Sequence, residues 1–503
     1  MVGSEKTTPP VFAALGAAAS YYAYPLLFSS GGFPLLGVLL VLIVLLSFGG
    51  VLSVSPFAFQ GEPSGGRRSM PSFPGVSLLL LASAALGFSL GLAARKQVPG
   101  PPTAGLPRER ITALTGRLAE DPRAYNDSRG IGSMDLSAVA GYGGVRASAK
   151  GRVSVFFPAE ALSSLKEFGR GCEIYTEGTM AGWKGGMLFR ASSVHVLKPA
   201  SPLEQVRTNF RLALVKKFDG PVWGPLASAL LLGIREDLDT DLSEGFRNSG
   251  CSHVLALSGM HLALLTGLIA FFLRRLLGIR AASAAGGIFV LGYVFLAGAQ
   301  PSLVRSAIMY FLGLFSLLMF FKNRLLSTLS LSFIIQIIFQ SEAGLSLSFI
   351  LSYLALAGIL WTGEDIRFLL RGKIPGLIGG SLSASLGAFA ATAAACSFFF
   401  GILRPVGIIA SLFIVPPASL FTVIALLALV VSFVLPPLFA PLDFVLTFLY
   451  RTLEFSVNLA GKVPGLDAPY PGPVLAASVL AALLVFGLKR LDLRYRKGFV
   501  PFG

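Results

Sequence analysis

The sequence predicts a mainly α-helical, multi-pass membrane protein with one small β domain inserted between its membrane helices. Of the 503 residues, 54% are hydrophobic and 13% are charged, whereas a globular domain carries about 25% charged residues. Long apolar runs recur along the chain, and a polar stretch interrupts them once. Because a hydrocarbon core offers no water to backbone N–H and C=O groups, apolar runs of about 20 residues are expected to cross it as helices.

Three apolar runs open the chain, near residues 11–28, 33–54 and 76–93. The connection between the second and third contains Arg67 and Arg68, and basic loops stay on the cytoplasmic side during insertion. We therefore expect residues 1–98 to form N-terminal transmembrane helices, the last of which leads outside. The first run is interpreted as a spanning helix, with a cleaved signal peptide as the alternative.

Residues 99–202 are predicted to form an extracytoplasmic β domain. Short alternating apolar segments are separated there by Gly, Asp and Pro, which is typical of strands, and about five strands fit a small barrel. The alternating positions that form this pattern are Ile111, Ala113, Thr115, Val145, Ala147, Val153, Val155, Ile174, Thr176, Leu188, Val194 and Val196.

The same domain interleaves basic and aromatic residues, the combination that single-strand binders use for phosphates and for stacking on bases. The candidate DNA-binding residues are Arg146, Lys150, Arg152, Phe156, Tyr175, Trp183 and Lys184. In the alternative interpretation the rings fill the core and the charges form a solvated surface. The formal net charge of the whole chain, +16, fits anionic lipid and nucleic acid equally well.

Residues 203–250 follow with apolar positions at helical spacing among basic residues, which predicts amphipathic helices at the membrane interface. Residues 251–490 return to apolar runs and are expected to form the main transmembrane domain, which brings the total to about 12 segments. The runs lie near residues 251–273, 281–298, 301–321, 325–339, 345–361, 377–400, 406–435, 442–459 and 474–488. The run 406–435 contains Pro416 and Pro417, and either one broken helix or two half-helices would fit it.

Basic residues near 274–275, 322–324, 367–373 and 489–497 can all face the cytoplasm if the run at Cys251 enters from outside. We therefore expect residues 491–503 to be a short basic cytoplasmic tail.

The densest polar cluster inside an apolar run spans residues 248–261 and holds Ser252, His253, Ser258, Gly259 and His261. Polar side chains at membrane depth are costly and usually face a bundle interior or a water-filled pathway. On a continuous helix the two histidines are too far apart to share a metal ion, so no metal is expected. Ser258 and His261 could pair as nucleophile and base, but no third group to orient the histidine is evident. The structural alternative is close helix packing at Ser258 and Gly259.

Three motifs in one order give the chain a resemblance to a known family. Leu230–Leu–Leu–Gly233 and Gly245–Phe–Arg247 precede the Gly250 to His261 run. A second motif, residues 298–309, contains Pro301, Ser302 and Arg305, and a third, residues 346–352, contains Ser348 and Ser352. In these motifs the sequence resembles the ComEC-type competence proteins, membrane channels of natural transformation. Residues 399–401 and the Pro416–Pro417 run resemble later family elements, although Ser411 stands where Asn is usual.

The resemblance implies that the β domain is of the OB type and that the chain passes single-stranded DNA through the inner membrane into the cytoplasm, without enzymatic activity, metal or cofactor. The DNA pathway would be lined by Ser252, His253, Ser258, Gly259, His261, Pro301, Ser302, Arg305, Ser348 and Ser352. Expected partners are single-stranded DNA, membrane lipid, a DNA receptor outside, and a cytoplasmic motor or single-strand-binding protein.

Many members of this family carry a C-terminal metallo-β-lactamase-like nuclease, for which the sequence leaves no room after residues 489–497. A separate nuclease is therefore expected. No Gly-x-x-x-x-Gly-Lys-(Ser/Thr) phosphate loop occurs, so ATP hydrolysis by that route is not expected. Two other functions fit parts of the pattern: a secondary transporter of a small solute, which would share the broken apolar helices, and an intramembrane Ser/His hydrolase.

Overall fold

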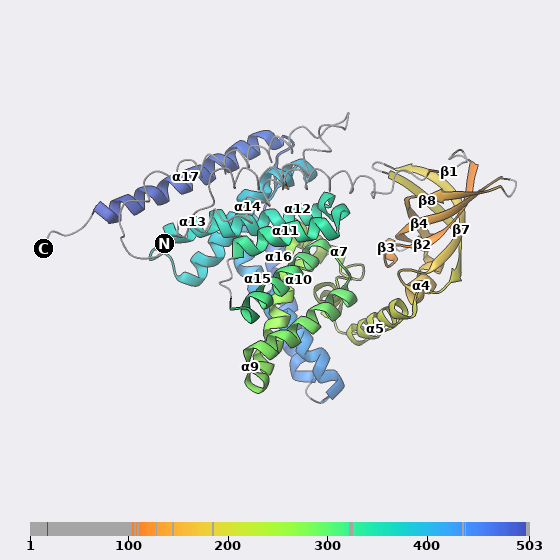
Figure 1. The fold of residues 1–503 in the computed structure, drawn as a ribbon, viewed down its shortest axis with the longest axis horizontal. Coiled ribbons are helices and arrows are strands. Elements are labelled where there is room, and N and C mark those ends of the chain that lie inside the picture. The colour runs from red at the N-terminus through yellow and green to blue at the C-terminus, as the bar shows by residue number, and fades with distance from the viewer. Residues whose placement is uncertain are drawn as a thin grey trace. The chain divides into compact units, whose positions relative to one another are not determined.

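The computed structural model of the chain describes residues 103–498, except 105–106, 108–109, 127, 143–144, 184–185, 321–324, 435–436 and 438, together with Ala18. The three predicted N-terminal helices, Lys184 and the end of the basic tail lie outside the described residues. The chain divides into two compact units, one of residues 96–238 and one of residues 1–95 with 239–503. Figure 1 shows the elements of both.

The smaller unit contains the β domain. Five of its strands pair in a closed cycle: β2 with β4 and β7, β7 with β8, β8 in parallel with β6, and β6 with β4. β3 and β5 extend β4, and β1 extends β5. Helix α4 (Ala159–Phe168) connects β6 to β7. The strands are β1 (Thr103–Ala104), β2 (Ile111–Leu118), β3 (Arg123–Asn126), β4 (Arg129–Gly141), β5 (Arg146–Lys150), β6 (Arg152–Pro158), β7 (Glu173–Trp183) and β8 (Gly186–Lys198).

The five apolar segments expected from the sequence fall at or in β2, β5, β6, β7 and β8. The sequence pattern misses β4, a strand of 13 residues that pairs with four others, because Gly130 and Gly132 interrupt its alternation. The inward positions of the ring form one core, to which β4 contributes Met134 and Val139 and the facing strands contribute Leu114, Phe157 and Phe189. Strand pairing closes the wall around this core, and Leu165 of α4 also packs into it.

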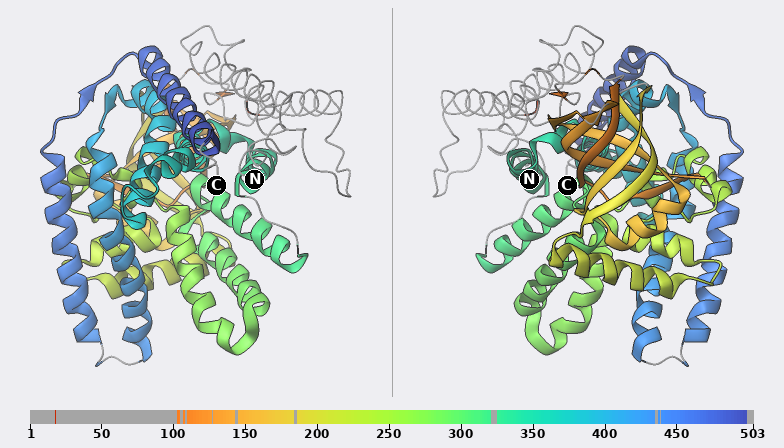
Figure 2. Two further views of the ribbon diagram at one scale, coloured as in Figure 1. Left: turned by 90° about the vertical axis from the view of Figure 1, so that its left-hand side faces the viewer. Right: turned by 90° about the vertical axis from the view of Figure 1, so that its right-hand side faces the viewer.

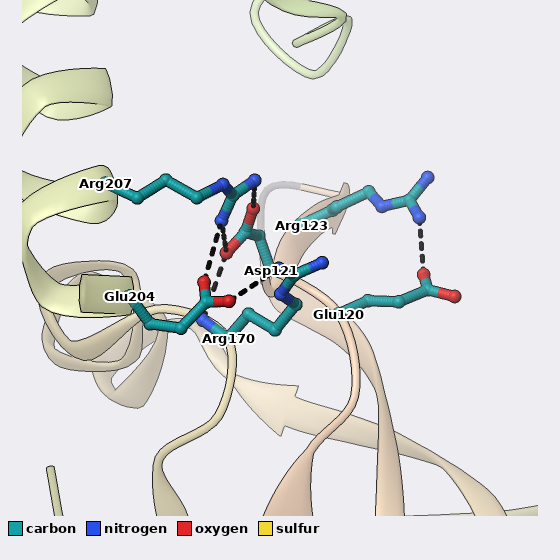
Figure 3. Close-up of polar contacts among 6 residues, drawn as sticks. All are labelled: Glu120, Asp121, Arg123, Arg170, Glu204 and Arg207. Carbon is teal, nitrogen blue, oxygen red and sulfur yellow. Dashed lines mark hydrogen bonds and ion pairs between the residues drawn. The ribbon is translucent and has the colours of Figure 1, made fainter. Parts of the chain in front are cut away.

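Helix α5 (Pro202–Phe218) is attached to the β domain by a network of charged residues. The side chain of Arg207 is 2% exposed, and its Nη1 and Nη2 donate to the two carboxylate oxygens of Asp121 at 3.3 and 2.9 Å. Arg170 donates from its backbone N to Asp121 at 3.0 Å and from Nη2 to Glu204 at 2.6 Å. Figure 3 shows how these four residues meet. One face of α5 is thereby fixed to the turn after β2 and to the turn after α4.

The charge of Asp121 is favoured by this network. Burial by itself would raise the pKa of the carboxyl group, but the hydrogen bond and charge of Arg207, together with the charge of Arg211, outweigh burial and leave the pKa below its ordinary value. After α5, helix α6 (Gly224–Leu232) is almost entirely buried and ends at Gly233, whose φ of 72° is left-handed.

The larger unit is helical. Its 3₁₀ turn spans Ser341–Leu345 and its π-helical turn spans Ile359–Gly363. Helices α15 and α16 lie side by side in both views of Figure 2. The helices are α7 (Thr240–Asn248), α8 (Ser252–Leu255), α9 (Gly259–Ala297), α10 (Pro301–Leu318), α11 (Leu325–Phe339), α12 (Leu347–Gly358), α13 (Glu364–Leu370), α14 (Gly376–Phe400), α15 (Val406–Val434), α16 (Phe439–Gly461) and α17 (Pro471–Gly498).

Six helical segments in the described part of the chain are long and apolar enough to cross a membrane, so this is a membrane protein. They are Gly259–Ala297, Pro301–Leu318, Leu347–Leu370, Gly376–Phe400, Val406–Ser432 and Pro471–Asp492. The predicted runs 251–273 and 281–298 fall largely in one helix, α9, which bends at Gly278, where φ is 75°. The predicted run 325–339 forms α11, which has only 15 residues. The run with Pro416 and Pro417 forms one helix, α15. The total of about 12 spans remains a prediction.

Helices α12 and α14 approach each other closely at glycines. A Cβ atom at Gly387 would lie 2.6 Å from the carbonyl oxygen of Gly358 and 2.8 Å from the backbone N of Gly363. Lipid tails are as apolar as leucine, so helices in a membrane associate by close packing, which small residues permit. A side chain at Gly387 would therefore force the two backbones apart.

We predict that Gly387→Ala destabilises the helical unit by about 1–3 kcal/mol, the usual cost of overpacking. Gly380→Ala is the matched control, because Gly380 lies on the same helix with nothing within 4 Å of an added Cβ, and alanine there adds helix propensity. The measurement is the temperature at which the detergent-purified chain leaves its monodisperse size-exclusion peak. Equal temperatures for the two variants would contradict the close packing.

A second prediction concerns pH. Because the folded-state pKa of Asp121 is depressed, its contribution to stability is present above the unfolded pKa and is lost as pH falls through the folded one. Wild type should therefore lose thermal stability between about pH 5 and pH 3 more steeply than Asp121→Asn, followed by tryptophan fluorescence, to which the buried Trp223 contributes. Glu120→Gln, at an exposed pair with Arg123, should keep the wild-type slope. Parallel slopes for wild type and Asp121→Asn would disprove the assignment.

Candidate functional site

The chain is not helical between α8 and α9. Ala256 and Ser258 have extended backbone conformations, with ψ of 134° and 167°. The treatment of His253 and His261 as positions on one continuous helix is therefore wrong, since Ala256, Leu257 and Ser258 separate two helices. The buried carbonyl of Leu257 accepts a hydrogen bond from Ser302 Oγ of α10 at 2.7 Å. Helix α10 thus satisfies a backbone group that the break leaves outside a helix.

His261 lies in the first turn of α9 and is fully buried. Its Nδ1 accepts from the backbone N of Ser258 at 3.3 Å and lies 3.4 Å from Ser258 Oγ. Since Nδ1 accepts this bond, the neutral ring carries its proton on Nε2, and Nε2 has no hydrogen-bond partner within the described residues. No carboxylate among those residues orients the ring, so Ser258 and His261 lack the third group of a catalytic triad.

Arg305, on the second turn of α10, connects three helices. Its side chain is 8% exposed. Nη1 donates to the backbone carbonyl of Ser352 on α12, and the guanidinium lies 5.7 Å from the ring centre of Tyr353. A Cβ atom at Gly259 would lie only 3.2 Å from Nη2, so the head of α9 packs directly against this charge. No ion pair to Arg305 occurs within the described part of the chain. A buried cation without an anion is costly at membrane depth.

A second layer of polar residues was missed by the sequence analysis. Gln336 of α11 donates from Nε2 to the carbonyl of Pro301 at 2.9 Å and accepts from the Tyr353 hydroxyl at 3.0 Å. Ser332 lies 3.3 Å from the same hydroxyl. The signal that could have found Gln336 is a lone amide inside the apolar run 325–339, because such a group needs partners in a membrane.

The predicted pathway residues therefore divide into two groups. Ser258, Gly259, His261, Pro301, Ser302, Arg305 and Ser352 meet where α10 contacts both the break before α9 and helix α12. We call this set the α9–α10 polar cluster. Ser252, His253 and Ser348 are exposed instead; the first two lie on α8 and the third lies one turn before Ser352.

The basic candidates of the β domain differ in how their charges are used. Arg146 and Lys150 are exposed on β5. Arg152 donates to both carboxylate oxygens of Asp135, at 2.7 and 3.1 Å, so its charge is already compensated. Arg190, which the sequence analysis did not select, is exposed and pairs in register with Phe156.

Phe156 and Tyr175 lie outside the buried core of the domain, whereas Phe157 and Phe189 belong to it. Phe156 is half-buried and lies 4.9 Å, between ring centres, from the exposed ring of Tyr125. Tyr175 donates to Glu177 at 2.9 Å, and this hydrogen bond raises the pKa of the phenol. Trp183 ends β7. Tyr125 and Phe156 thus offer a pair of rings beside Arg190.

Within the described residues no group of three or more His, Cys, Asp or Glu side chains is arranged to hold a metal ion.

Comparison with known proteins identifies relatives of this site. The family model described as "Competence protein" matches residues 230–491, which include the whole α9–α10 polar cluster. An uncharacterized protein of Aquifex aeolicus (strain VF5) is 27% identical over 263 residues, 51% of this chain and 61% of that protein. ComE operon protein 3 of Bacillus subtilis (strain 168) is 32% identical over 133 residues, 25% of this chain and 17% of that protein. The chain thus covers less than two thirds of either relative, and no solved structure matches it.

We predict that Ser302→Ala destabilises the helical unit by about 1–3 kcal/mol, because it leaves the buried Leu257 carbonyl without its partner. The matched control is Ser316→Ala on the same helix, whose hydroxyl donates to the carbonyl of Leu312 one turn earlier. Thermal stability of the two purified variants in the same detergent is the measurement. If Ser316→Ala lowers it as much as Ser302→Ala does, the bond across the break contributes nothing of its own.

Proposed function

The chain belongs to the competence protein family, and on that premise we propose that it is a channel that passes single-stranded DNA across the inner membrane during natural transformation. The observation that carries the proposal is the α9–α10 polar cluster, which sits inside an otherwise apolar helical unit at an interruption of its helices. The family model that matches the chain covers every residue of this cluster.

The interruption between α8 and α9 supports a transport role on physical grounds. Non-helical backbone at membrane depth is tolerated only where protein buries it or where it lines a water-filled cavity. Transporters use such discontinuous helices to present backbone groups and helix ends to their cargo. In this proposal a DNA strand contacts the exposed Ser252, His253 and Ser348. The buried α9–α10 polar cluster stabilises the interruption between α8 and α9.

Arg305 supplies a fixed positive charge to this pathway. Its guanidinium is held by the Ser352 carbonyl and by the Tyr353 ring, and its Nε has no hydrogen-bond partner within the described residues. An uncompensated cation lowers the cost of bringing a phosphate to the same depth. Hydroxyl and imidazole groups can then bond a passing phosphate without holding it, which conduction requires.

The β domain is proposed to be an OB-type barrel that receives the strand. Support comes from the closed cycle of five strands, the parallel pairing of β6 with β8, and the helix α4 between β6 and β7. Phe156, Tyr125 and Arg190 offer stacking rings beside a cation, and Arg146 and Lys150 add exposed charge. These groups favour a single strand of any sequence, because every base has a face to stack and every nucleotide a phosphate.

The remaining features of the proposal follow the family. The chain would cross the inner membrane about 12 times, with the β domain outside and the C-terminus in the cytoplasm. Its partners would be lipid, a DNA receptor outside, a nuclease, and a cytoplasmic motor or single-strand-binding protein. No catalytic residue, metal or cofactor is assigned. The secondary-transporter alternative shares the discontinuous helix, so the experiment must distinguish DNA from solute.

The test follows labelled double-stranded DNA in cells that carry wild type, a deletion, Arg305→Gln, or His253→Ala with Ser348→Ala, and scores surface binding separately from cytoplasmic signal. The deletion should abolish the cytoplasmic signal while surface binding persists. Each variant should reduce entry roughly tenfold, as expected for about 1.4 kcal/mol lost at a limiting step.

Arg451→Gln is the matched control, because Arg451 is an exposed arginine of α16 that pairs with Glu454; it should take up DNA at the wild-type rate. Immunoblots establish equal abundance, and the His253/Ser348 pair changes only exposed residues, so loss of folding does not imitate loss of transport. Unchanged cytoplasmic DNA in the deletion would rule out DNA transport and leave the solute alternative.

A further inference from the structure

Helix α5 has apolar residues on two separate faces. One face is buried in its own unit and contains Leu214 and Phe218, at 6% and 3% exposure, beside the Arg207 that binds Asp121. The sequence predicted an amphipathic interfacial helix in this segment without distinguishing which apolar positions face outward. The structure assigns Leu214 and Phe218 to packing inside the unit, so they are not available to a partner.

The other face is apolar and, in the part of the chain that the structure describes, largely exposed. Leu203, Val206 and Phe210 are 65%, 64% and 55% exposed. Their spacing of three and four residues places them in one row along the helix, and the exposed Ala213 continues the row. Single exposed apolar side chains are ordinary, but a contiguous row on one helix marks an interaction surface. We call this row the α5 apolar stripe.

The α5 apolar stripe cannot turn inward to escape water. The two-pronged bond from Arg207 to Asp121 and the bond from Arg170 to Glu204 fix the rotation of α5 about its own axis (Figure 3). Arg207 is almost fully buried, so breaking this network would leave a buried charge unpaired. The adjacent face of the helix, which carries the stripe, is therefore presented outward as a rigid surface.

The chemistry around the stripe fits a lipid surface. Lys216 and Lys217 form the last turn of the helix, and basic residues beside an apolar face attract anionic headgroups while the apolar side chains enter the acyl boundary. Val222, 55% exposed in the turn after α5, extends the apolar surface. Helix α5 is also near a candidate membrane span in the sequence, since it ends at Phe218 and the first such span among the described residues begins at Gly259.

We propose that the α5 apolar stripe lies in the headgroup region of the membrane that the same chain crosses, and that it anchors the β domain at that surface. The anchor is built on the Arg207–Asp121 bond, which transmits the position of the helix to the strands. This inference does not depend on DNA transport, because it concerns only α5, its network and lipid.

The experiment measures the depth of α5 in a bilayer. The full-length chain is reconstituted in nanodiscs of phosphatidylcholine and phosphatidylglycerol, with a spin label at Val206→Cys or Phe210→Cys. The control label is at Asn209→Cys, an exposed neighbour outside the stripe. Unmodified chain gives the background from Cys172, Cys251 and Cys396, of which the first two are buried and the third is half-buried.

Labels on the stripe should be relaxed several-fold more by lipid-soluble oxygen, relative to a water-soluble nickel chelate, than the label at Asn209. Equal nickel accessibility at all three sites would place the stripe in water and overturn the proposal. Labels immobilised and shielded from both reagents would also overturn it, since the stripe would then pack against protein. Nanodiscs of phosphatidylcholine alone should give a shallower depth if the lysines bind anionic headgroups, and unchanged depth would refute that part.

Discussion

The helical unit depends on one constraint: where the chain stops being helical inside an apolar environment, its backbone groups need partners from the protein itself. At the break before α9 the side chain of Ser302 helps to meet that constraint, since its hydroxyl donates to the carbonyl of Leu257. The N-terminal turn of α9 is satisfied locally, by the ring of His261 bonded to the backbone N of Ser258. The two bonds allow an interruption that a lipid-facing helix could not tolerate.

The same place carries a buried charge. Arg305 is joined to α12 through a backbone carbonyl and an aromatic ring rather than through a carboxylate. A carboxylate would have stabilised the guanidinium but would also have repelled an anionic cargo. Elsewhere the unit does use an ion pair, between Lys489 and Asp365, whose side chains are 14% and 4% exposed. Arg305 is held by a carbonyl and a ring, whereas Lys489 is paired with the carboxylate of Asp365. This difference supports the proposed pathway at Arg305 and a structural role for Lys489.

In the β unit the buried polar contact that fixes an element is made by two charged side chains, not by a hydroxyl group. Closing five strands into a ring removes most free edges, and the Arg207–Asp121 bond then attaches α5 to the end of that ring. Both units therefore hold an element in place with a buried polar contact whose loss would leave one partner unpaired. Such contacts specify one arrangement more strongly than apolar packing does, because apolar surfaces accept many neighbours.

The sequence by itself determined what local pattern can express: the apolar runs that become α10, α14 and α15, the alternation in β2 and β6, and the motif residues from Ser258 to Arg305. Only the tertiary structure decided the rest. The sequence shows that Leu203 and Leu214 are both apolar, but the Arg207–Asp121 contact determines which of the two is buried. The break before α9, the place of Gln336 and the pairing of the glycine-containing strand β4 all depend on partners distant in the chain, and no local pattern encodes the distance between residues that meet only on folding.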